Sequence, residues 1–400
     1  MLRRPFASAG VALVCILLAV IAIEAVLRGA GLAYPDFFRD DPVLGRSLRP
    51  GAYGWWNAEG TSYVEINADG MRDRDHVIAK PAGVVRIAVL GDAYAAAFEV
   101  SQDAGFTAEI ERDLATCPAL AGRTVEVLNF GLGGAGTAQQ YLMLDDRVWK
   151  YAPDVVLLAF VTGDDVRDNS RKLKGSRRTA YFVHDAQDRL VLDPAFDARR
   201  DRLRVGPLHD LWQTVFNHSR LLQVVTEARR SVRALTRERE AAQGWDAHAD
   251  RQLYAPPTDP EWVRAWSVTE DLLRAMIADV REHRAGFLLA TLTNAIQVDP
   301  DVGKRERFAA ALGVPDLSYP DRRIGELARA ENVPYAALVP PLGAWAAENQ
   351  TCVHGFENAL PCAGHWNENG HRLAGEELAA ALCADVVPTL AVGRDRTSSR

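Results

Sequence analysis

The chain has 400 residues, of which 48% are hydrophobic and 25% charged, and this balance excludes a disordered, collagen-like or disulfide-knotted protein. Lysine and arginine number 46 against 53 aspartates and glutamates, so the formal net charge is −7. A mildly acidic chain has no general field that attracts nucleic acid, and we predict no nucleic-acid partner. The length suits one large α/β domain or two smaller ones.

The N-terminus carries the first predicted element. After two arginines, residues 5–23 contain no charge, and a helix of that length covers about 28 Å, close to the thickness of a bilayer core. A signal peptide has a shorter apolar region, so we favour a retained anchor over cleavage near residues 29–31 or a buried core helix. The arginines are expected to stay cytoplasmic, which predicts a single-pass inner-membrane protein with a periplasmic C-terminal domain.

Five cysteines are too few for a disulfide scaffold, but an extracytoplasmic compartment permits one or two bonds. Cys352 and Cys362 lie close together in a loop-like stretch and are the preferred pair. Cys117 and Cys383 are the second candidate pair. Free buried thiols are an equally good interpretation for them, because a sequence alone does not determine which cysteines are bonded. Cys15 lies in the apolar N-terminal segment.

An alternation of strands and helices begins near residue 85. The preceding residues 29–84 are rich in glycine, proline and aromatic residues, and we expect short strands and turns that pack on the main domain. The runs VVRIAVLGD, TVEVLNFG and PDVVLLAFVTGDD are typical of strands buried on both faces. Helices are expected at 106–114 and 138–151. This order predicts a parallel sheet with helices on both faces.

The alternation of strands and helices is interrupted at about residues 170–260, which we interpret as an insertion at the carboxyl edge of the third strand. It should contain a solvated basic loop at 171–178, a hairpin at 179–194 and an amphipathic helix at 209–235. The core then resumes with helices at 261–284, 322–331 and 371–382 and strands at 286–293 and 333–340. The predicted organisation is therefore an anchor (1–28), an extension (29–84), a main domain (85–390) and a mobile tail (391–400).

In an open parallel sheet, ligands bind beyond the carboxyl ends of the strands. Polar and glycine-rich turns follow all three of the first strands, and another such segment precedes the last helix. Because strand ends meet at one edge, these segments predict a single crevice. They are Gly91-Asp92-Ala93-Tyr94, the stretch from Asn129 to Gly134, Thr162-Gly163-Asp164-Asp165, and Gly364-His365-Trp366-Asn367.

In their order and context, the four segments resemble the SGNH/GDSL hydrolases, particularly the membrane-anchored, envelope-facing branch. The resemblance covers about residues 40–390, apart from the insertion, and implies a flavodoxin-like three-layer fold. In such hydrolases a serine attacks an ester carbonyl, and a histidine oriented by an aspartate acts as general base. The serine N–H, a turn glycine N–H and an asparagine amide stabilise the oxyanion.

Mapped onto this chain, the resemblance leaves three positions changed. Ala93 stands at the nucleophile position, Asp164 at the oxyanion asparagine position, and Ala363 at the position of the acid. Gly134 remains at the oxyanion position and His365 at that of the general base. A methyl group cannot attack a carbonyl, and a carboxylate repels an oxyanion unless it is protonated. A histidine without its acid partner also loses its fixed tautomer.

We therefore predict a non-catalytic pseudo-hydrolase that binds an envelope polysaccharide or a partner protein, with no cofactor and no metal. The alternative is an active ester hydrolase or O-acyltransferase on cell-envelope carbohydrate, with a rearranged site around His365. Two weaker alternatives are a cation held by Asp92, Asp164 and Asp165 with His365, and Thr162 as a substitute nucleophile.

Three further features of the sequence need an interpretation. The glycines at 131, 133 and 136 have the spacing of a dinucleotide-binding loop, although no acidic residue stands at the expected distance. Trp366 either stacks on a sugar or packs against the last helix. For His371 we expect a structural role at the start of that helix.

Overall fold

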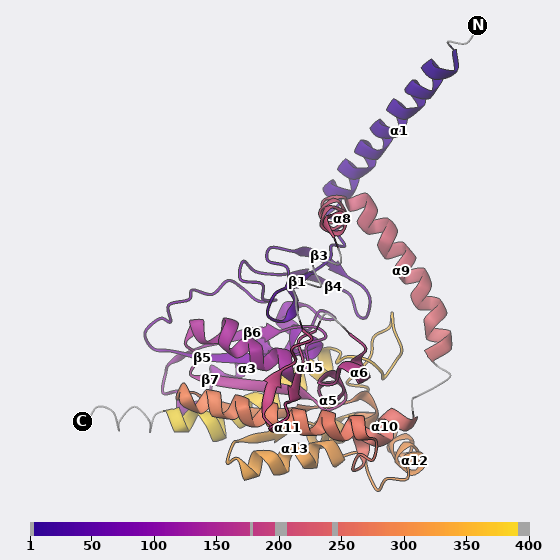
Figure 1. Ribbon diagram of the computed structural model, residues 1–400. Helices are drawn as coiled ribbons and strands as arrows, with labels where there is room; N and C mark the ends of the chain where they lie inside the picture. The colour runs from indigo at the N-terminus through magenta and orange to yellow at the C-terminus, as the bar shows by residue number, and fades with distance from the viewer. Residues whose placement is uncertain (1–3, 177–178, 197–205, 242–246, 391–400) are drawn as a thin grey trace.

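The computed structural model describes residues 4–176, 179–196, 206–241 and 247–390. Its centre is a parallel sheet of five strands (Figure 1). When the five strands are numbered along the chain, they lie side by side in the order 2-1-3-4-5. This is the order of a flavodoxin-like doubly wound sheet, so the predicted fold class is confirmed. The strands across the sheet are β6 (Thr124–Gly131), β5 (Val84–Gly91), β7 (Val155–Val161), β10 (Gly286–Leu292) and β11 (Tyr335–Ala337).

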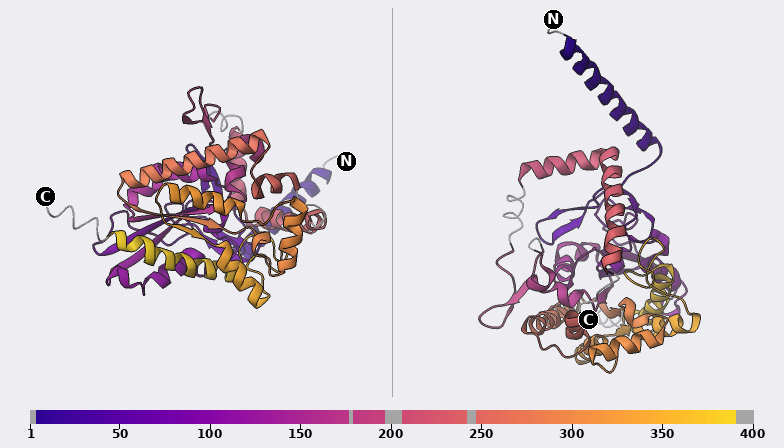
Figure 2. Two further views of the ribbon diagram at one scale, coloured as in Figure 1. Left: turned by 90° about the horizontal axis from the view of Figure 1, so that it is seen from below. Right: turned by 90° about the vertical axis from the view of Figure 1, so that its right-hand side faces the viewer.

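Helices cover both faces of the sheet, as the turned view shows (Figure 2). Alternate side chains of the strands pack into two separate apolar clusters, one on each face of the sheet. The strand sequences are therefore apolar almost throughout. Ala88 and Leu90 of β5 share a cluster with α4 (Thr137–Met143), α11 (Pro260–Glu282) and α13 (Tyr319–Ala330). Ile87 and Val89 share the other cluster with α3 (Phe106–Leu114), α14 (Val339–Asn349) and α15 (Glu368–Ala381).

Most predicted core elements are confirmed within a few residues. The expected helix at 138–151 is only partly regular, because α4 passes into a wider turn at Leu144–Val148 and a tight one at Trp149–Tyr151. The strand expected at 333–340 is reduced to β11, since α14 begins at Val339. Neither α14 nor α12 (Val302–Leu312) was predicted.

The residues before β5 form two small antiparallel hairpins. These are β1 (Phe38–Asp41) with β2 (Gly45–Leu48), and β3 (Tyr53–Trp56) with β4 (Ser62–Glu65). Phe37, Leu44 and Val64 are buried in the same cluster as the core strands and α11. Hydrophobic burial therefore fixes this extension on the main sheet, next to the strand ends.

The insertion contains the expected hairpin, β8 (Phe182–His184) with β9 (Leu190–Leu192). The single amphipathic helix expected at 209–235 is wrong: the extended backbone of Ser219 separates α8 (Pro207–His218) from α9 (Arg220–Ala241). Part of the expected basic loop is helical, as α6 (Arg171–Lys174), and its residues 177–178 lie outside the described part. Another short helix, α10 (Ala247–Tyr254), precedes α11.

The N-terminal helix α1 (Arg4–Gly29) projects from the rest of the molecule (Figure 1). Its segment Gly10–Gly29 has a mean hydropathy of 2.8 and no buried residue, so it is long and apolar enough for one membrane span or a signal anchor. The predicted tail at 391–400 lies outside the described residues.

Two disulfides close the chain, and both candidate pairs are confirmed. Cys117–Cys383 joins the loop after α3 to the turn that follows α15, across 266 residues of sequence. Cys352–Cys362 closes a loop of 10 residues just before α15. Cys15 is free and exposed on α1.

Candidate functional site

The turns after β5 and β6 meet at the carboxyl edge of the sheet. Ala93 opens the short helix α2 (Ala93–Ala96), and Asp92 caps that helix by accepting the Tyr94 N–H at 2.9 Å. A β-carbon built on Gly133 would lie 3.9 Å from the Ala93 methyl. The position of the nucleophile and the glycine turn are therefore neighbours, as the resemblance implies.

Gly134 adopts a φ of +76°, a backbone conformation that favours glycine. Its carbonyl accepts a hydrogen bond from Lys174 Nζ at 2.6 Å, and the same ammonium group contacts Asp168 Oδ2 at 2.7 Å. The first helix of the insertion thus holds the turn that carries the oxyanion position.

His365 has an acid partner, contrary to the sequence-based expectation. Its Nδ1 lies 2.7 Å from Glu59 Oε2, and its backbone N–H donates to Glu59 Oε1 at 2.7 Å. Ala363 indeed offers no carboxylate, but the extension supplies one from the turn before β4. The bond to Glu59 fixes the imidazole, so the loss of orientation inferred from Ala363 does not occur.

A second carboxylate, Glu99, lies beside this pair. Its Oε1 is 3.7 Å from His365 Nδ1, and its other oxygen is buried without a hydrogen-bond partner. Burial raises the pKa of Glu99. Burial lowers the pKa of His365, but the hydrogen bond to Glu59 and the charge of Glu99 outweigh it and raise that pKa to about 9. The histidine is therefore an imidazolium at neutral pH and a weak general base there.

The donor atoms of Glu59, Glu99 and His365 lie within 4.8 Å of one another, a grouping that can hold a metal ion. The 2.7 Å between Nδ1 and Oε2 is a hydrogen-bond distance, so a proton already fills the place between them. We therefore describe the three groups as an acid–histidine cluster, in which Glu99 is buried and Glu59 and His365 are half-buried.

The acidic residues after β7 are engaged elsewhere. Asp164 Oδ1 accepts from Arg167 Nη2 at 2.6 Å, and its side chain is 46% exposed. Asp165 is fully buried, where its oxygens accept from Val161 N and Gln140 Nε2. A cation site built from these residues therefore does not form among the described residues.

The floor of the crevice is acidic. Burial, followed by the charge of Asp164, raises the pKa of Asp92 to about 7. A carboxylate at the asparagine position, paired with a guanidinium, offers no N–H of its own to an oxyanion. Asp164 therefore supplies no hydrogen-bond donor at the position where the resemblance places an asparagine amide.

Two alternative chemistries are wrong on geometric grounds. Thr162 is fully buried, and its hydroxyl accepts from Asn294 Nδ2 at 3.0 Å, so it cannot reach a substrate. Gly131 is required by packing, because a β-carbon there would lie 2.2 Å from the backbone nitrogen of Ala96. The glycine spacing therefore reflects the contact between β6 and α2.

Trp366 and His371 are both structural. Trp366 is fully buried, and its Nε1 donates to Thr293 Oγ1 at 2.8 Å, so the sugar-stacking interpretation is wrong. His371 is also fully buried, and its Nδ1 accepts the Phe106 N–H at 3.3 Å. It links α15 to the start of α3, as its predicted structural role requires.

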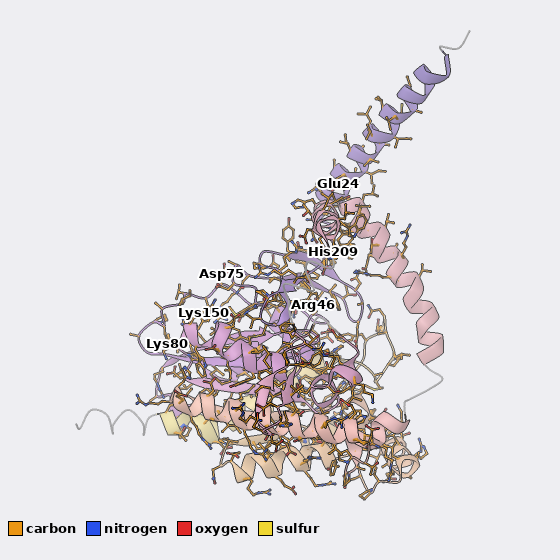
Figure 3. All side chains as sticks on the ribbon, viewed as in Figure 1. Glu24, Arg46, Asp75, Lys80, Lys150 and His209 are labelled. Atoms are coloured by element: carbon orange, nitrogen blue, oxygen red, sulfur yellow. A yellow bond between two sulfur atoms is a disulfide. The ribbon has the colours of Figure 1, made fainter. Side chains whose placement is uncertain are left out.

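A cavity of about 700 Å³ adjoins the glycine turn. It lies between the turn after β6, the first hairpin of the extension and the insertion, and polar side chains dominate its lining. The lining includes Arg39, Asp40, Arg46, Gly133, Gly134, Gln139, Lys174, Ser176, Thr179, His209, Gln213 and Asn217. Figure 3 labels two of these lining residues, Arg46 and His209.

The strand order defines a flavodoxin-like α/β protein, and a polar cavity adjoins its strand ends. No protein-family model and no curated protein matches the chain. Several solved structures do match the chain. One is an acetyl xylan esterase, with 14% identity, 74% of this chain and 100% of that chain covered, and a TM-score of 0.36.

The second is described as belonging to the G-D-S-L family of lipolytic proteins, from Desulfitobacterium hafniense, with 11% identity, 74% and 99% coverage and a TM-score of 0.32. The third is a catalytic mutant of an acetylxylan esterase from Geobacillus stearothermophilus, with 10% identity, 74% and 94% coverage and a TM-score of 0.36. By their descriptions, two of the three are acetyl xylan esterases and one is a lipolytic protein. The fold assignment rests on the strand order of the sheet.

The sequence reasoning missed Glu59 and Glu99. Glu59 lies 306 residues before His365, in a turn with no motif around it. Glu99 carried a usable signal, because it is the single charge in the otherwise apolar run from Ala93 to Val100. An acid in such a run is typically buried for a reason.

Proposed function

We propose that this chain is a membrane-anchored, extracytoplasmic protein with an SGNH/GDSL hydrolase-like fold, whose crevice binds a ligand without breaking a bond in it. The observation that carries this proposal is the methyl group of Ala93 at the start of α2, where the resemblance places the attacking hydroxyl. The paired carboxylate of Asp164 and the imidazolium of His365 add to it, because neither group suits ester hydrolysis at neutral pH.

The arginines before the apolar helix and the two disulfides support an assignment of compartment. The arginines before the apolar helix favour a cytoplasmic N-terminus, and disulfides persist in oxidising compartments. We therefore assign the main domain to the periplasmic side of the inner membrane.

For the ligand we favour an envelope polysaccharide over a partner protein. The cavity beside Gly133 is large, and hydrogen-bonding side chains, among them Gln213, Asn217, Ser176 and Thr179, line it together with charged and apolar ones. Carbohydrate presents hydroxyl groups of matching character, whereas a protein interface core is rich in apolar and aromatic groups.

The competing proposal is an active ester hydrolase or O-acyltransferase centred on His365. The specific observation in its favour is the Glu59–His365 hydrogen bond, which preserves an acid–histidine pair. It lacks a nucleophile, and the histidine would act as a base only near its pKa of about 9.

The two proposals are separated by turnover of acetylated glycans and p-nitrophenyl esters. We expect wild-type turnover at the level of buffer, unchanged in His365→Ala. Wild-type turnover that disappears in His365→Ala would instead establish the hydrolase.

Binding is tested separately with wild-type chain and cell-envelope polysaccharide fractions in calorimetry. Ser176→Trp should fill the cavity and abolish binding, whereas Ser231→Trp on the exposed side of α9 should leave it unchanged. Equal binding by both variants would place the ligand elsewhere.

A further inference from the structure

Helix α8 has two faces of opposite character. Its polar face lines the cavity through His209, Asp210, Gln213 and Asn217. Its other face carries an apolar stripe at the spacing i, i+3, i+4, i+7, and the described residues leave this stripe uncovered. The stripe consists of Leu208, Leu211, Trp212 and Val215, which are 80%, 60%, 54% and 44% exposed.

The position of α8 is set by the end of α1. Figure 1 shows α8 end-on beside the C-terminal end of α1. The Glu24 carboxylate accepts the backbone N–H groups of Arg220 and Leu221, at 2.9 and 3.1 Å. It therefore caps the start of α9 directly after the break that ends α8.

A second contact fixes the other side of the break. The Arg28 guanidinium donates to the carbonyl of His218, the last residue of α8, and also pairs with Glu24 at 2.8 Å. The end of α8 and the start of α9 are thus both bonded to the last turns of α1. This arrangement ties the C-terminal end of α8 to the last turns of α1.

The charge pattern of α1 defines the depth at which α8 lies. Residues 5–23 are uncharged, and Glu24 is the first charged residue after them. In a bilayer that surrounds the uncharged stretch, Glu24 and Arg28 lie at the membrane surface. Because both bind the α8–α9 junction, α8 lies at the same surface.

We propose that α8 is a membrane-surface helix, which lies in the plane of the bilayer and inserts its apolar stripe into the leaflet from which α1 emerges. The lipid assignment is favoured over a protein partner because Glu24 and Arg28, directly after the uncharged span, bond the junction that ends α8. Trp212 adds support, since tryptophan favours the level of the lipid headgroups. The proposal rests on the anchoring role of α1 under Proposed function, and it places one wall of the cavity at the membrane surface.

The test uses the full chain in nanodiscs of phosphatidylethanolamine and phosphatidylglycerol, with an environment-sensitive fluorophore on single cysteines. Leu211→Cys reports on the stripe and Gln213→Cys on the cavity face, both in a Cys15→Ala background. The native Cys15 is the only described cysteine outside a disulfide, and it serves as the control inside the span. Spin-labelled lipid is the quencher.

We expect a blue shift and quenching by spin-labelled lipid at position 211, close to those at Cys15, and neither at position 213. Quenching at Cys15 without quenching at 211 would overturn this inference and leave the anchor intact. Equal quenching at 211 and 213 would also overturn it, because the helix would lack the proposed orientation. Absence of quenching at Cys15 itself would refute the anchoring role, and with it this inference.

Discussion

The carboxylate of Glu59 holds the imidazole of His365 through two hydrogen bonds of 2.7 Å, although the two residues lie 306 positions apart. One bond goes to the ring and the other to the backbone N–H. The extension before the main domain thus completes a pair that the loop before α15 has lost. An acid–histidine pair therefore persists beside a position that carries no nucleophile.

The contact can be broken sterically without removing either partner. A β-carbon at Gly364 would lie 2.1 Å from Glu59 Oε1, so Gly364→Ala should displace the carboxylate. Without that hydrogen bond, burial should lower the pKa of His365 from about 9. Titration of the protein labelled with ¹⁵N-histidine measures the change.

Gly51→Ala is the matched control, because Gly51 also has a positive φ but no atom stands within 4 Å of its added β-carbon. It should leave the titration of His365 unchanged. An unaltered pKa in Gly364→Ala would show that Glu59 does not set it.

The same pair predicts how stability depends on pH. The folded-state pKa of His365, about 9, lies above its usual 6.5, so the folded state binds the proton more tightly. The resulting stabilisation is fully present below about pH 6.5 and is lost as the pH rises through about 9. The free energy of unfolding from urea titrations in detergent should fall over this window, and fall less in Glu59→Gln. Equal pH slopes for the two proteins would contradict the assignment.

The two disulfides should differ in their contribution to stability. In the chain-entropy account, closing a long loop restricts the unfolded chain more, so the bond across 266 residues should contribute about 5 kcal/mol. The bond across 10 residues should contribute about 2.5 kcal/mol. Urea unfolding of Cys117→Ser/Cys383→Ser and of Cys352→Ser/Cys362→Ser compares them. A larger loss from the second pair would refute this ranking.

Restoring the missing groups should create activity with a characteristic pH profile. Ala93→Ser supplies a hydroxyl, and adding Asp164→Asn should raise ester turnover about 10²-fold further through an oxyanion donor. Because His365 must be neutral to act as base, kcat/KM should rise with pH up to about 9. Turnover of p-nitrophenyl acetate over this range is the measurement. A flat pH profile would exclude His365 as the base.

The sequence predicts most of the fold because β5 and β7 are apolar on both faces, and such runs admit few other structures. It does not predict the break at Ser219, since the apolar spacing continues from α8 into α9 and the cap comes from Glu24, far away in the chain. Long-range contacts of this kind leave no local pattern.

The candidate site is predictable to a similar extent. Gly134 and Ala93 follow strand ends, and the sheet topology alone brings such positions together. Glu59 belongs to a hairpin whose place depends on the burial of side chains such as Phe37 and Val64 in the core cluster. Its role therefore appears only when that packing is known.

The central claim is that the site keeps an acid–histidine pair, Glu59 with His365, while the nucleophile position carries only the methyl group of Ala93. A fluorophosphonate probe tests it, because an activated serine hydroxyl displaces fluoride and retains the phosphonyl group. Near pH 9, mass spectrometry should find no adduct on the wild-type chain, an adduct at position 93 in Ala93→Ser, and none in Ala93→Ser/His365→Ala. An adduct on the wild-type chain, or none on Ala93→Ser, would contradict the account.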